Sequence, residues 1–491
     1  MRNRGNVSKR ISTLLLFAFF SISNLSAQVR TVEATGEYRM GDNDTRNDAR
    51  KLALLDAKRL ALEQAGTYLQ SVTEVKNLML SRDDINTYTA GILEVVDQKE
   101  QTAIEGNTTI VRIEVTVHID TAKVAQQIAA LRENSATKNE LTELKAEMDR
   151  LRELVTKQNQ ELAKIKSQTE VAALAKERQQ LISNAEVNTL LTQSWVALSG
   201  SQGGVLITGT STPEGRIKAR TLLEQALAAD PLSPKVHERM GVLLNEEGNR
   251  TAAIQEFRKA LDLKPENPGA HNSLGNSLRS NGDLTGAVAE YREAIRQDPN
   301  YALAHLNLGK ALQNQKDINS AIVEYREAIR LKPNEASFHN DLALFLQEQR
   351  DLNGAAAQFR ETIRLAPSVP VYHYQFGRIL RSQKDLIGAA AEFRETIRLQ
   401  PNHIEAHNEL GNTLLDQKDL DGAAMAFREA VRLQPNYVPA RFNLGLVLSD
   451  QGRREEAVQA FQEFLKIAGN SPSDKPFIDR AQSYLQGGSA R

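Results

Sequence analysis

The sequence predicts a mainly α-helical protein, in which a long solenoid of repeated helix pairs follows a heptad-patterned helix and a small α+β region. Two observations carry this prediction. Aromatic residues make up only 5% of the 491 residues, a composition typical of helical repeats. Seven prolines also recur at intervals of 34 residues: Pro231, Pro265, Pro299, Pro333, Pro367, Pro401 and Pro435. A chain of this length is too long for one core, so we expect several domains.

The charge balance and the lack of cysteine exclude several functions. With 61 basic and 62 acidic residues the net charge is −1, which does not indicate binding to nucleic acid or to an anionic membrane. The chain has no cysteine. Disulfides, thiolate metal sites, cysteine nucleophiles and a lipid-modified cysteine are therefore excluded.

Residues 1–27 have the three parts of a secretory signal peptide. A basic stretch ends at Arg10, an apolar run covers 11–22, and Leu25-Ser26-Ala27 offers small residues for cleavage before Gln28. The alternative is a retained anchor, but the run is shorter than the ~20 residues that a spanning helix needs. We expect cleavage, no transmembrane segment in the mature chain, and a periplasmic or secreted location.

Residues 28–120 predict a small α+β domain. Every second residue from Val111 to Ile119 is apolar and the residues between are polar, so this strand should bury one face. Apolar residues also share one face of a helix that should end near Gly66: Ala49, Leu52, Ala53, Leu60 and Ala61. We expect, in order, a strand at 29–40, this helix, a shorter helix at 82–90, and strands at 92–102 and 109–119 around a turn at 105–107.

The run Gly36-Glu37-Tyr38, the helix from Ala49 to Ala61 and the closing strands resemble the N-terminal domain of the flagellar assembly protein T family and its small lipoprotein relatives. The resemblance covers roughly 90 residues. It implies a structural piece of an envelope assembly without an active site.

Residues 121–185 predict a coiled coil. Its seam recurs at spacings of three and four: Leu141, Leu144, Met148, Leu151, Val155, Gln158, Leu162 and Ile165. In a parallel arrangement the flanking charges are complementary, in the pairs Glu140–Lys145, Glu147–Arg152 and Glu161–Lys166. This pattern predicts a homo-oligomer formed through 141–165, either dimer or trimer. The alternatives are a solvated single helix and a helix packed on its own chain.

The 34-residue period is accompanied by fixed residue types. If Pro299 is position 32 of its unit, then positions 7 and 8 are Leu274-Gly275, position 20 is Ala287, position 24 is Tyr291 and position 27 is Ala294. Small residues at 8 and 20 allow two helices to touch, the aromatic ring fills the gap beside them, and proline ends the second helix. The units resemble tetratricopeptide repeats, which implies an α-solenoid.

The repeats divide the rest of the chain. We expect a first, atypical unit at 186–233, with its first helix at about 187–199, including Trp195, and an enlarged loop at 200–215. Seven full units should follow at 234–471. Residues 472–491 should form a capping helix and tail, as the exposed end of a repeat array requires.

Nothing in the sequence predicts an enzyme, a cofactor or a metal site. Six histidines occupy position 4 of successive units: His237, His271, His305, His339, His373 and His407. Because stacked units lie about 10 Å apart, these histidines cannot share a metal ion, and we expect them to pack at the outer end of each first helix. Gly200 to Gly204 lacks the Lys-Ser/Thr ending of a phosphate loop.

The first helix of each unit should line a concave groove that holds a protein or an extended peptide. The candidate binding residues are Asn272, Asn276, Asn307, Lys310, Asn340, Arg378, Arg381, Asn408, Asn412 and Asn443. An amide both donates and accepts, so these asparagines can clamp a peptide backbone, and Arg378 and Arg381 can bind a carboxylate. The row resembles the asparagine-lined repeats of the O-linked N-acetylglucosamine transferases. The alternative is a merely solvated surface.

The sequence therefore predicts an exported, non-catalytic scaffold or adaptor of the bacterial cell envelope that self-associates through its coiled coil. The order of signal peptide, coiled coil and repeats is similar to that of the periplasmic coordinators of envelope constriction that work with the Tol system. The alternative is a structural component of a secretion, motility or polysaccharide-export apparatus.

Overall fold

The computed structural model describes residues 29–40, 45–71, 85, 95–106, 108–120, 124–125, 128, 135–162, 168–199, 212–468 and 475–487. The predicted signal peptide, almost all of the predicted helix at 82–90 and most of the loop at 200–215 lie outside these residues. The chain forms two compact units, residues 1–249 and 250–491.

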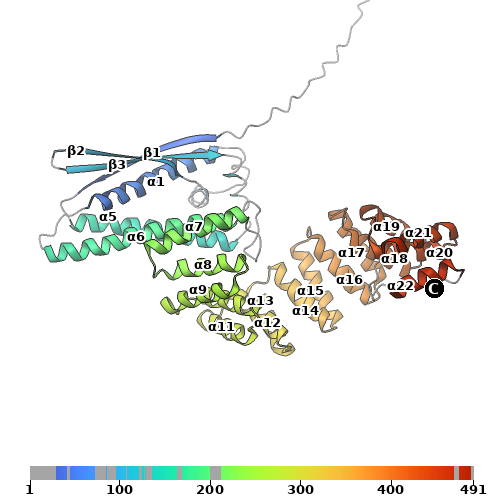
Figure 1. Cartoon of the computed structure of the whole chain (residues 1–491). Coiled ribbons are helices and arrows are strands. Elements are labelled where there is room, and N and C mark those ends of the chain that lie inside the picture. The colour runs from blue at the N-terminus through green and yellow to red at the C-terminus, as the bar shows by residue number, and fades with distance from the viewer. Residues whose placement is uncertain are drawn as a thin grey trace, which may run out of the picture. The chain divides into compact units, whose positions relative to one another are not determined.

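The first unit contains a three-stranded antiparallel sheet in the order β1-β3-β2 (Figure 1). Its strands are β1 (Val29–Arg39), β2 (Val95–Glu105) and β3 (Thr108–Asp120). The central strand β3 buries Val111, Ile113, Val115, Val117 and Ile119. The three predicted strands and the alternation of β3 are therefore confirmed.

Helix α1 (Arg46–Ser71) covers one face of the sheet with small side chains. Its contact face is a row of alanines at four-residue spacing, each at most 1% exposed: Ala49, Ala53, Ala57, Ala61 and Ala65. Strand β1 approaches so closely that a Cβ added at Gly36 would lie 2.1 Å from the carbonyl oxygen of Ala53. The prediction that the helix ends near Gly66 was wrong, because Gly66 is buried within the helix and Leu69 continues the buried face.

Helices α5 (Ser135–Leu162) and α6 (Gln168–Ser199) pack alongside α1 (Figure 1). Five residues of the predicted seam are buried, namely Leu141, Leu144, Leu151, Val155 and Gln158. Leu141 joins the core formed by the sheet and α1, and Val155 packs with Leu52 of α1 and Ile182 of α6. In the structure this helix therefore packs on its own chain, which was one of the two alternatives to a coiled coil. Each proposed charge pair includes a side chain outside the described set, and self-association stays a prediction.

The first repeat unit is built into the end of this bundle. Helix α6 runs through the predicted boundary at 185/186 without a break, and its last turns pair with α7 (Pro213–Ala229). The helices approach closely here, since a Cβ added at Gly215 would lie 2.4 Å from the carbonyl oxygen of Ala197. Helix α8 (Pro234–Glu246) follows. The predicted first helix at 187–199 is therefore the end of a longer helix.

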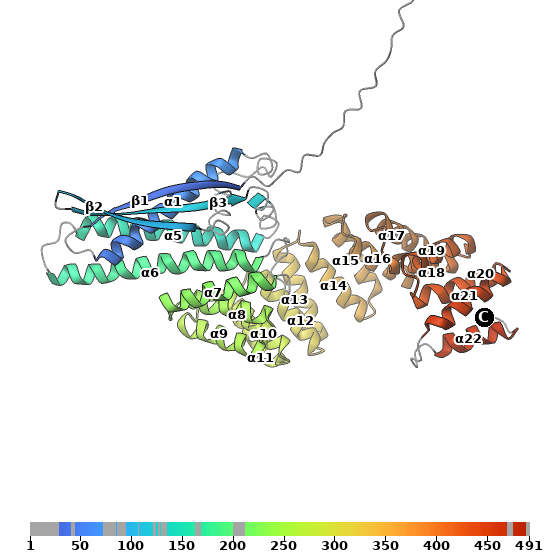
Figure 2. The same ribbon diagram turned by 45° about the horizontal axis from the view of Figure 1, so that its top comes forward.

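The second unit is a stack of helix pairs that follow one another along the chain (Figure 2). Its helices are α9 (Arg250–Leu263), α10 (Pro268–Ser280), α11 (Leu284–Gln297), α12 (Ala302–Asn314), α13 (Ile318–Leu331), α14 (Ala336–Glu348), α15 (Leu352–Leu365), α16 (Pro370–Ser382), α17 (Leu386–Leu399), α18 (Ile404–Asp416), α19 (Leu420–Leu433), α20 (Val438–Asp450), α21 (Arg454–Ile467) and α22 (Lys475–Leu485). From α10 to α20 the first helix of each pair starts 34 residues after the last, as predicted.

Within each pair the predicted small residues and aromatic rings meet. A Cβ added at Gly275 would lie 2.6 Å from Cε1 of Tyr291, and one at Gly411 would lie 2.6 Å from Cε1 of Phe427. The position-24 rings from Tyr291 onward are at most 1% exposed. Helix α22 closes the stack, because Ala481 is buried against Phe442, Phe461 and Phe464. Among the described helices, none combines the length and the apolar composition of a membrane span.

Candidate binding face on the first helices of the repeats

In several neighbouring units the first helices of the pairs, here called A helices, lie next to one another. Helix α10 contacts α12, α16 contacts α18, and α18 contacts α20, in addition to the contacts within each pair. Neighbouring units of a curved stack approach most closely on its inner side, so the A helices line that side. We call their solvent-facing surface from α10 to α20 the inner face.

Most of the predicted asparagines bond one another across the units. Nδ2 of Asn307 donates to Oδ1 of Asn272 at 2.9 Å. Nδ2 of Asn443 donates to Oδ1 of Asn408 at 3.3 Å and to Oδ1 of Asn412 at 3.0 Å. An amide has two donor hydrogens and two acceptor lone pairs, so these side chains keep bonding capacity for a ligand. In the folded chain, however, these asparagines connect neighbouring units. The sequence did not predict these hydrogen bonds.

Three further candidate residues are also engaged within the stack. The hydroxyl of Tyr291 donates to Oδ1 of Asn276 at 2.8 Å. Nζ of Lys310 lies 2.6 Å from Oδ2 of Asp341 in the next unit. Arg381 donates to Glu409 at 2.9 Å and to Asp416 at 3.0 Å, both in the next unit. Arg381 therefore joins two units. Of the two arginines predicted to bind a carboxylate of the ligand, Arg378 is the one that remains accessible.

Asn340 and Arg378 remain most open to a partner. The side-chain amide of Asn340 has no hydrogen bond to any described residue, and the residue is partly exposed. Arg378 is exposed, and the one hydrogen bond of its guanidinium to a described residue is a 3.3 Å contact to Gln375. Its guanidinium carbon lies 5.9 Å from the ring centroid of Tyr374. An amide without a side-chain hydrogen bond to a described residue and a guanidinium with one long hydrogen bond thus lie on the A helices of successive units, α14 and α16.

Three exposed apolar side chains accompany them, and the sequence reasoning missed these. Leu303 on α12 and Leu344 on α14 are each 38% exposed, and Val371 on α16 is 47% exposed. They occupy positions 2 and 9 of their units, which also face the predicted groove. These residues could have been found in the sequence, because each is an apolar residue at a position that should face solvent.

An aromatic and acidic group adjoins Arg378 toward the C-terminus. The rings of Tyr374 and His403 are 4.9 Å apart between centroids, and Nδ1 of His403 lies 3.3 Å from a carboxylate oxygen of Glu405. Burial, followed by the charges of Glu405 and nearby groups, raises the pKa of Tyr437 to about 12. Burial also raises the pKa of Tyr374. The phenols of Tyr374 and Tyr437 therefore stay neutral at physiological pH and can donate hydrogen bonds.

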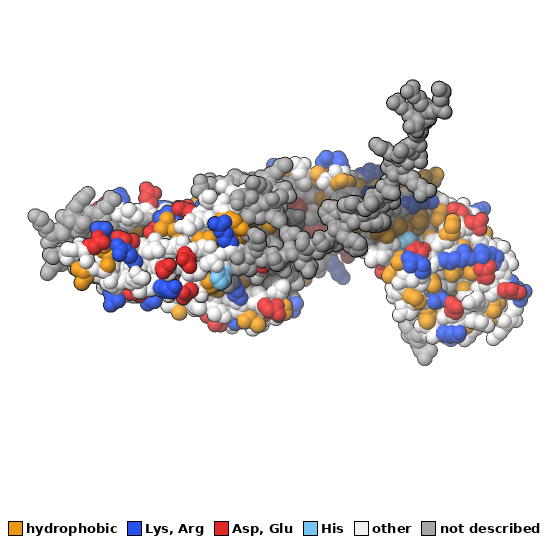
Figure 3. Space-filling view, turned by 90° about the horizontal axis from the view of Figure 1, so that it is seen from above, with side chains coloured by type: hydrophobic (Ala, Val, Ile, Leu, Met, Phe, Trp, Pro, Cys, Tyr) orange, Lys and Arg blue, Asp and Glu red, His pale blue; other side chains and the backbone are white. Residues whose placement is uncertain are grey.

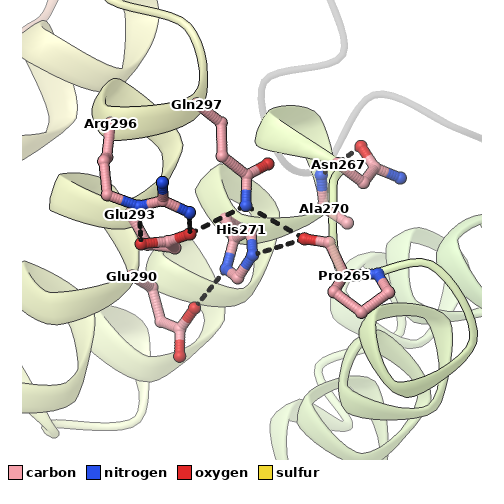
Figure 4. A network of polar contacts seen from close by, with 8 residues as sticks. All are labelled: Pro265, Asn267, Ala270, His271, Glu290, Glu293, Arg296 and Gln297. Carbon is pink, nitrogen blue, oxygen red and sulfur yellow. Dashed lines mark hydrogen bonds and ion pairs between the residues drawn. The ribbon is translucent and has the colours of Figure 1, made fainter.

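The position-4 histidines make polar bridges rather than apolar contacts. In Figure 4, Nδ1 of His271 lies 2.6 Å from Glu290 and Nε2 lies 3.1 Å from the carbonyl oxygen of Pro265. The other five make the same bond to the proline carbonyl six residues earlier, at 2.9–3.3 Å: His237, His305, His339, His373 and His407. Among the described residues, no group of three or more His, Cys, Asp or Glu side chains could hold a metal ion.

Charges of both signs are mixed on the molecular surface. On the face shown in Figure 3, acidic and basic side chains are interspersed, so this face has no broad patch of one sign. A nucleic-acid site would need such a basic patch.

Family models match the repeats. Residues 243–278 and 275–316 match a model described as TPR repeat. Residues 306–370, 340–404, 374–438 and 408–473 match a model described as Tetratricopeptide repeat. The matches include no catalytic family. They lie outside residues 28–120, so they give no support to the resemblance of that region to the flagellar assembly module.

Several solved structures are similar to this chain. YrrB, described as a TPR protein with an unusual peptide-binding site, is 22% identical, with 38% of this chain and 95% of that chain covered at a TM-score of 0.34. The pilF protein of Pseudomonas aeruginosa is 21% identical, with coverage of 42% and 95% and a TM-score of 0.37. MamA of Desulfovibrio magneticus RS-1 is 19% identical, with coverage of 35% and 96% and a TM-score of 0.32. At such TM-scores none of these similarities carries an argument about function. No curated protein matches the sequence.

Proposed function

Since this chain is a tetratricopeptide-repeat protein over residues 243–473, we propose that it is a non-catalytic scaffold that holds a protein partner on the inner face of its repeats. The observation that carries the proposal is the run of available groups on α12, α14 and α16. Leu303, Leu344 and Val371 offer exposed apolar surface, and Asn340 and Arg378 offer polar groups that keep most of their bonding capacity.

The spacing of these groups fits an extended peptide. Packed helices are about 10 Å apart, so three successive A helices span about 20 Å. A peptide in extended conformation covers that distance with about six residues, at about 3.3 Å per residue. Apolar side chains of the peptide would lie on Leu303, Leu344 and Val371. The amide of Asn340 would bond the peptide backbone, and Arg378 would bind a carboxylate.

A location in the bacterial cell envelope is part of the proposal. The support is the signal-like order of residues 1–27. The alternative of a structural component in a secretion, motility or polysaccharide-export apparatus remains beside it. Self-association through 141–165 has less support, because the seam is already buried against α1 and α6.

A paired substitution on the inner face tests the proposal. Peptides would be selected on the full chain from a random display library, and their Kd would be measured by fluorescence polarisation. We expect the double variant Asn340→Ala/Arg378→Ala to weaken binding by about 10-fold or more, because one neutral and one charge-assisted hydrogen bond together contribute about 2–4 kcal/mol.

The matched control is Asn319→Ala/Arg326→Ala, which removes the same two residue types from exposed positions on α13. This control should leave the Kd unchanged. Equal binding to both double variants would exclude the inner face as the peptide site.

A further inference from the structure

Three histidines of the array place both ring nitrogens against hydrogen-bond acceptors. Nε2 of each faces a proline carbonyl oxygen, at 3.1 Å for His271, 3.3 Å for His305 and 2.9 Å for His373. Nδ1 of each faces a carboxylate oxygen, of Glu290 at 2.6 Å, Glu324 at 2.7 Å and Glu392 at 2.6 Å. A neutral imidazole has one N–H, so it can satisfy only one of the two acceptors, whereas the imidazolium satisfies both.

Each bridge joins the preceding unit to its own helix pair. The histidine lies at the start of an A helix, the glutamate lies on the second helix of the same pair, and the proline carbonyl ends the preceding unit. Figure 4 shows this arrangement for His271, with Gln297 also donating to the carbonyl oxygen of Pro265 at 3.0 Å. Closing the bridge therefore fixes the junction between two units.

The charged groups around these rings are acidic. For His305 they are Glu324, in direct contact, and Glu327, which is paired with Arg330 at 2.7 Å. The set around His373 is equivalent, with Glu392 in contact and Glu395 paired with Arg398 at 2.6 Å.

The set around His271 has the same plan. Glu290 is in contact, and Glu293 pairs with Arg296 at 2.6 Å. The proximity of Glu293 and His271 is mutual, since His271 is among the groups that lower the pKa of Glu293. The three rings therefore share one arrangement of hydrogen-bond acceptors and acidic neighbours.

The units that start at Ala336 and Val438 differ from these three at one or both of the two positions. His339 faces Oε1 of Gln358 at 2.9 Å, and a glutamine amide can turn to donate to an unprotonated nitrogen. In the last unit Arg441 replaces histidine, donates to the carbonyl oxygen of Pro435 at 2.5 Å and pairs with Glu463. A permanent cation thus occupies the place that the imidazolium takes in the other units.

We propose that the repeat array carries a protonation-dependent latch at its unit junctions, formed by the pairs His271–Glu290, His305–Glu324 and His373–Glu392. The latches are closed when the rings are protonated and hold successive units together. Loss of the proton removes one donor per junction and loosens the stack. The array is therefore stiffer at mildly acidic pH than at mildly alkaline pH.

The sign of the pH dependence follows from the contacts. The hydrogen bond to Glu324 raises the pKa of His305, and the one to Glu392 raises the pKa of His373. A pKa that is raised on folding contributes stability that is complete below the unfolded value of 6.5 and is lost as the pH rises through the folded value. Stability from the latches should therefore fall as the pH rises above about 6.5.

The test replaces each glutamate of the latches by glutamine, so that every histidine has the kind of partner that His339 has in Gln358. In the full chain, Glu290→Gln/Glu324→Gln/Glu392→Gln gives all three histidines a neutral partner. Thermal unfolding would be followed by circular dichroism from pH 5.5 to 8.5. We expect the unfolding midpoint of the wild-type chain to fall over this range by about 5 °C more than that of the triple variant.

Two further variants separate the latch from a general effect of charge. Glu177→Gln/Glu214→Gln/Glu455→Gln removes the same charge from exposed positions, and it should keep the wild-type pH dependence. Gln358→Glu should add a fourth latch and steepen the dependence. Ring C–H resonances of labelled histidines, assigned with single His→Gln variants, give each pKa directly. The proposal is overturned if the triple Glu→Gln variant keeps the wild-type pH dependence, or if His305 and His373 titrate at or below the ordinary histidine value of about 6.5.

Discussion

Replacing Phe427 by alanine should destabilise the repeat array by about 3–5 kcal/mol, as for other fully buried aromatic side chains. The ring is 0% exposed and fills the space left by Gly411. Each unit of a repeat array is held by its neighbours, so the loss should extend to the adjoining units. Unfolding by urea, followed by circular dichroism, should show a lower midpoint for this variant.

The control for this prediction is Met425→Ala on the same helix, because Met425 is 64% exposed. Trp195 is the one tryptophan of the chain and lies in the first unit, so its fluorescence reports on that unit separately. We expect the fluorescence transition to be the same in both variants. Equal circular-dichroism midpoints for Phe427→Ala and Met425→Ala would show that the ring at position 24 is not a main support of the array.

Replacing Trp195 by alanine should cost the first unit a similar amount, about 3–5 kcal/mol. Trp195 is 5% exposed in α6, and the guanidinium carbon of Arg239 from α8 lies 3.7 Å from its ring centroid. Burial lowers the pKa of Arg239 to about 9, so this cation has little water around it. Without the ring, α6 and α8 lose both a large apolar contact and a cation–π contact.

Circular dichroism during urea unfolding measures this loss, with Glu177→Ala as the control at an exposed position of the same helix. Only Trp195→Ala should lower the stability of the first unit. If both variants unfold at the same urea concentration, Trp195 does not hold α6 and α8 together.

The repeat array could be predicted from the sequence because the same constraint occurs again in every unit. Gly275 faces the ring of Tyr291, and Gly411 faces the ring of Phe427, so one unit explains the others. The strands could also be predicted, because the alternation of β3 reflects one buried face. A pattern that recurs with a fixed period identifies the secondary structure that has that period.

Features that depend on the spacing between units could not be predicted. Asn272 bonds Asn307, which is 35 residues later, so the pair joins position 5 of one unit to position 6 of the next. The burial of Leu141 is a similar case, because a heptad seam looks the same whether its partner is a second copy or another part of the same chain. Only the folded chain shows which contact is made.

Photo-crosslinking in the source cells tests the central claim most directly. A photoreactive phenylalanine analogue would replace Leu344, 38% exposed on the inner face, or Ile387, 81% exposed on the second helix of a later unit. The inner-face scaffold predicts a discrete crosslinked partner for position 344, reduced by Asn340→Ala/Arg378→Ala, and none for position 387. A partner that crosslinks equally at both positions, or that is unaffected by the double substitution, would contradict it.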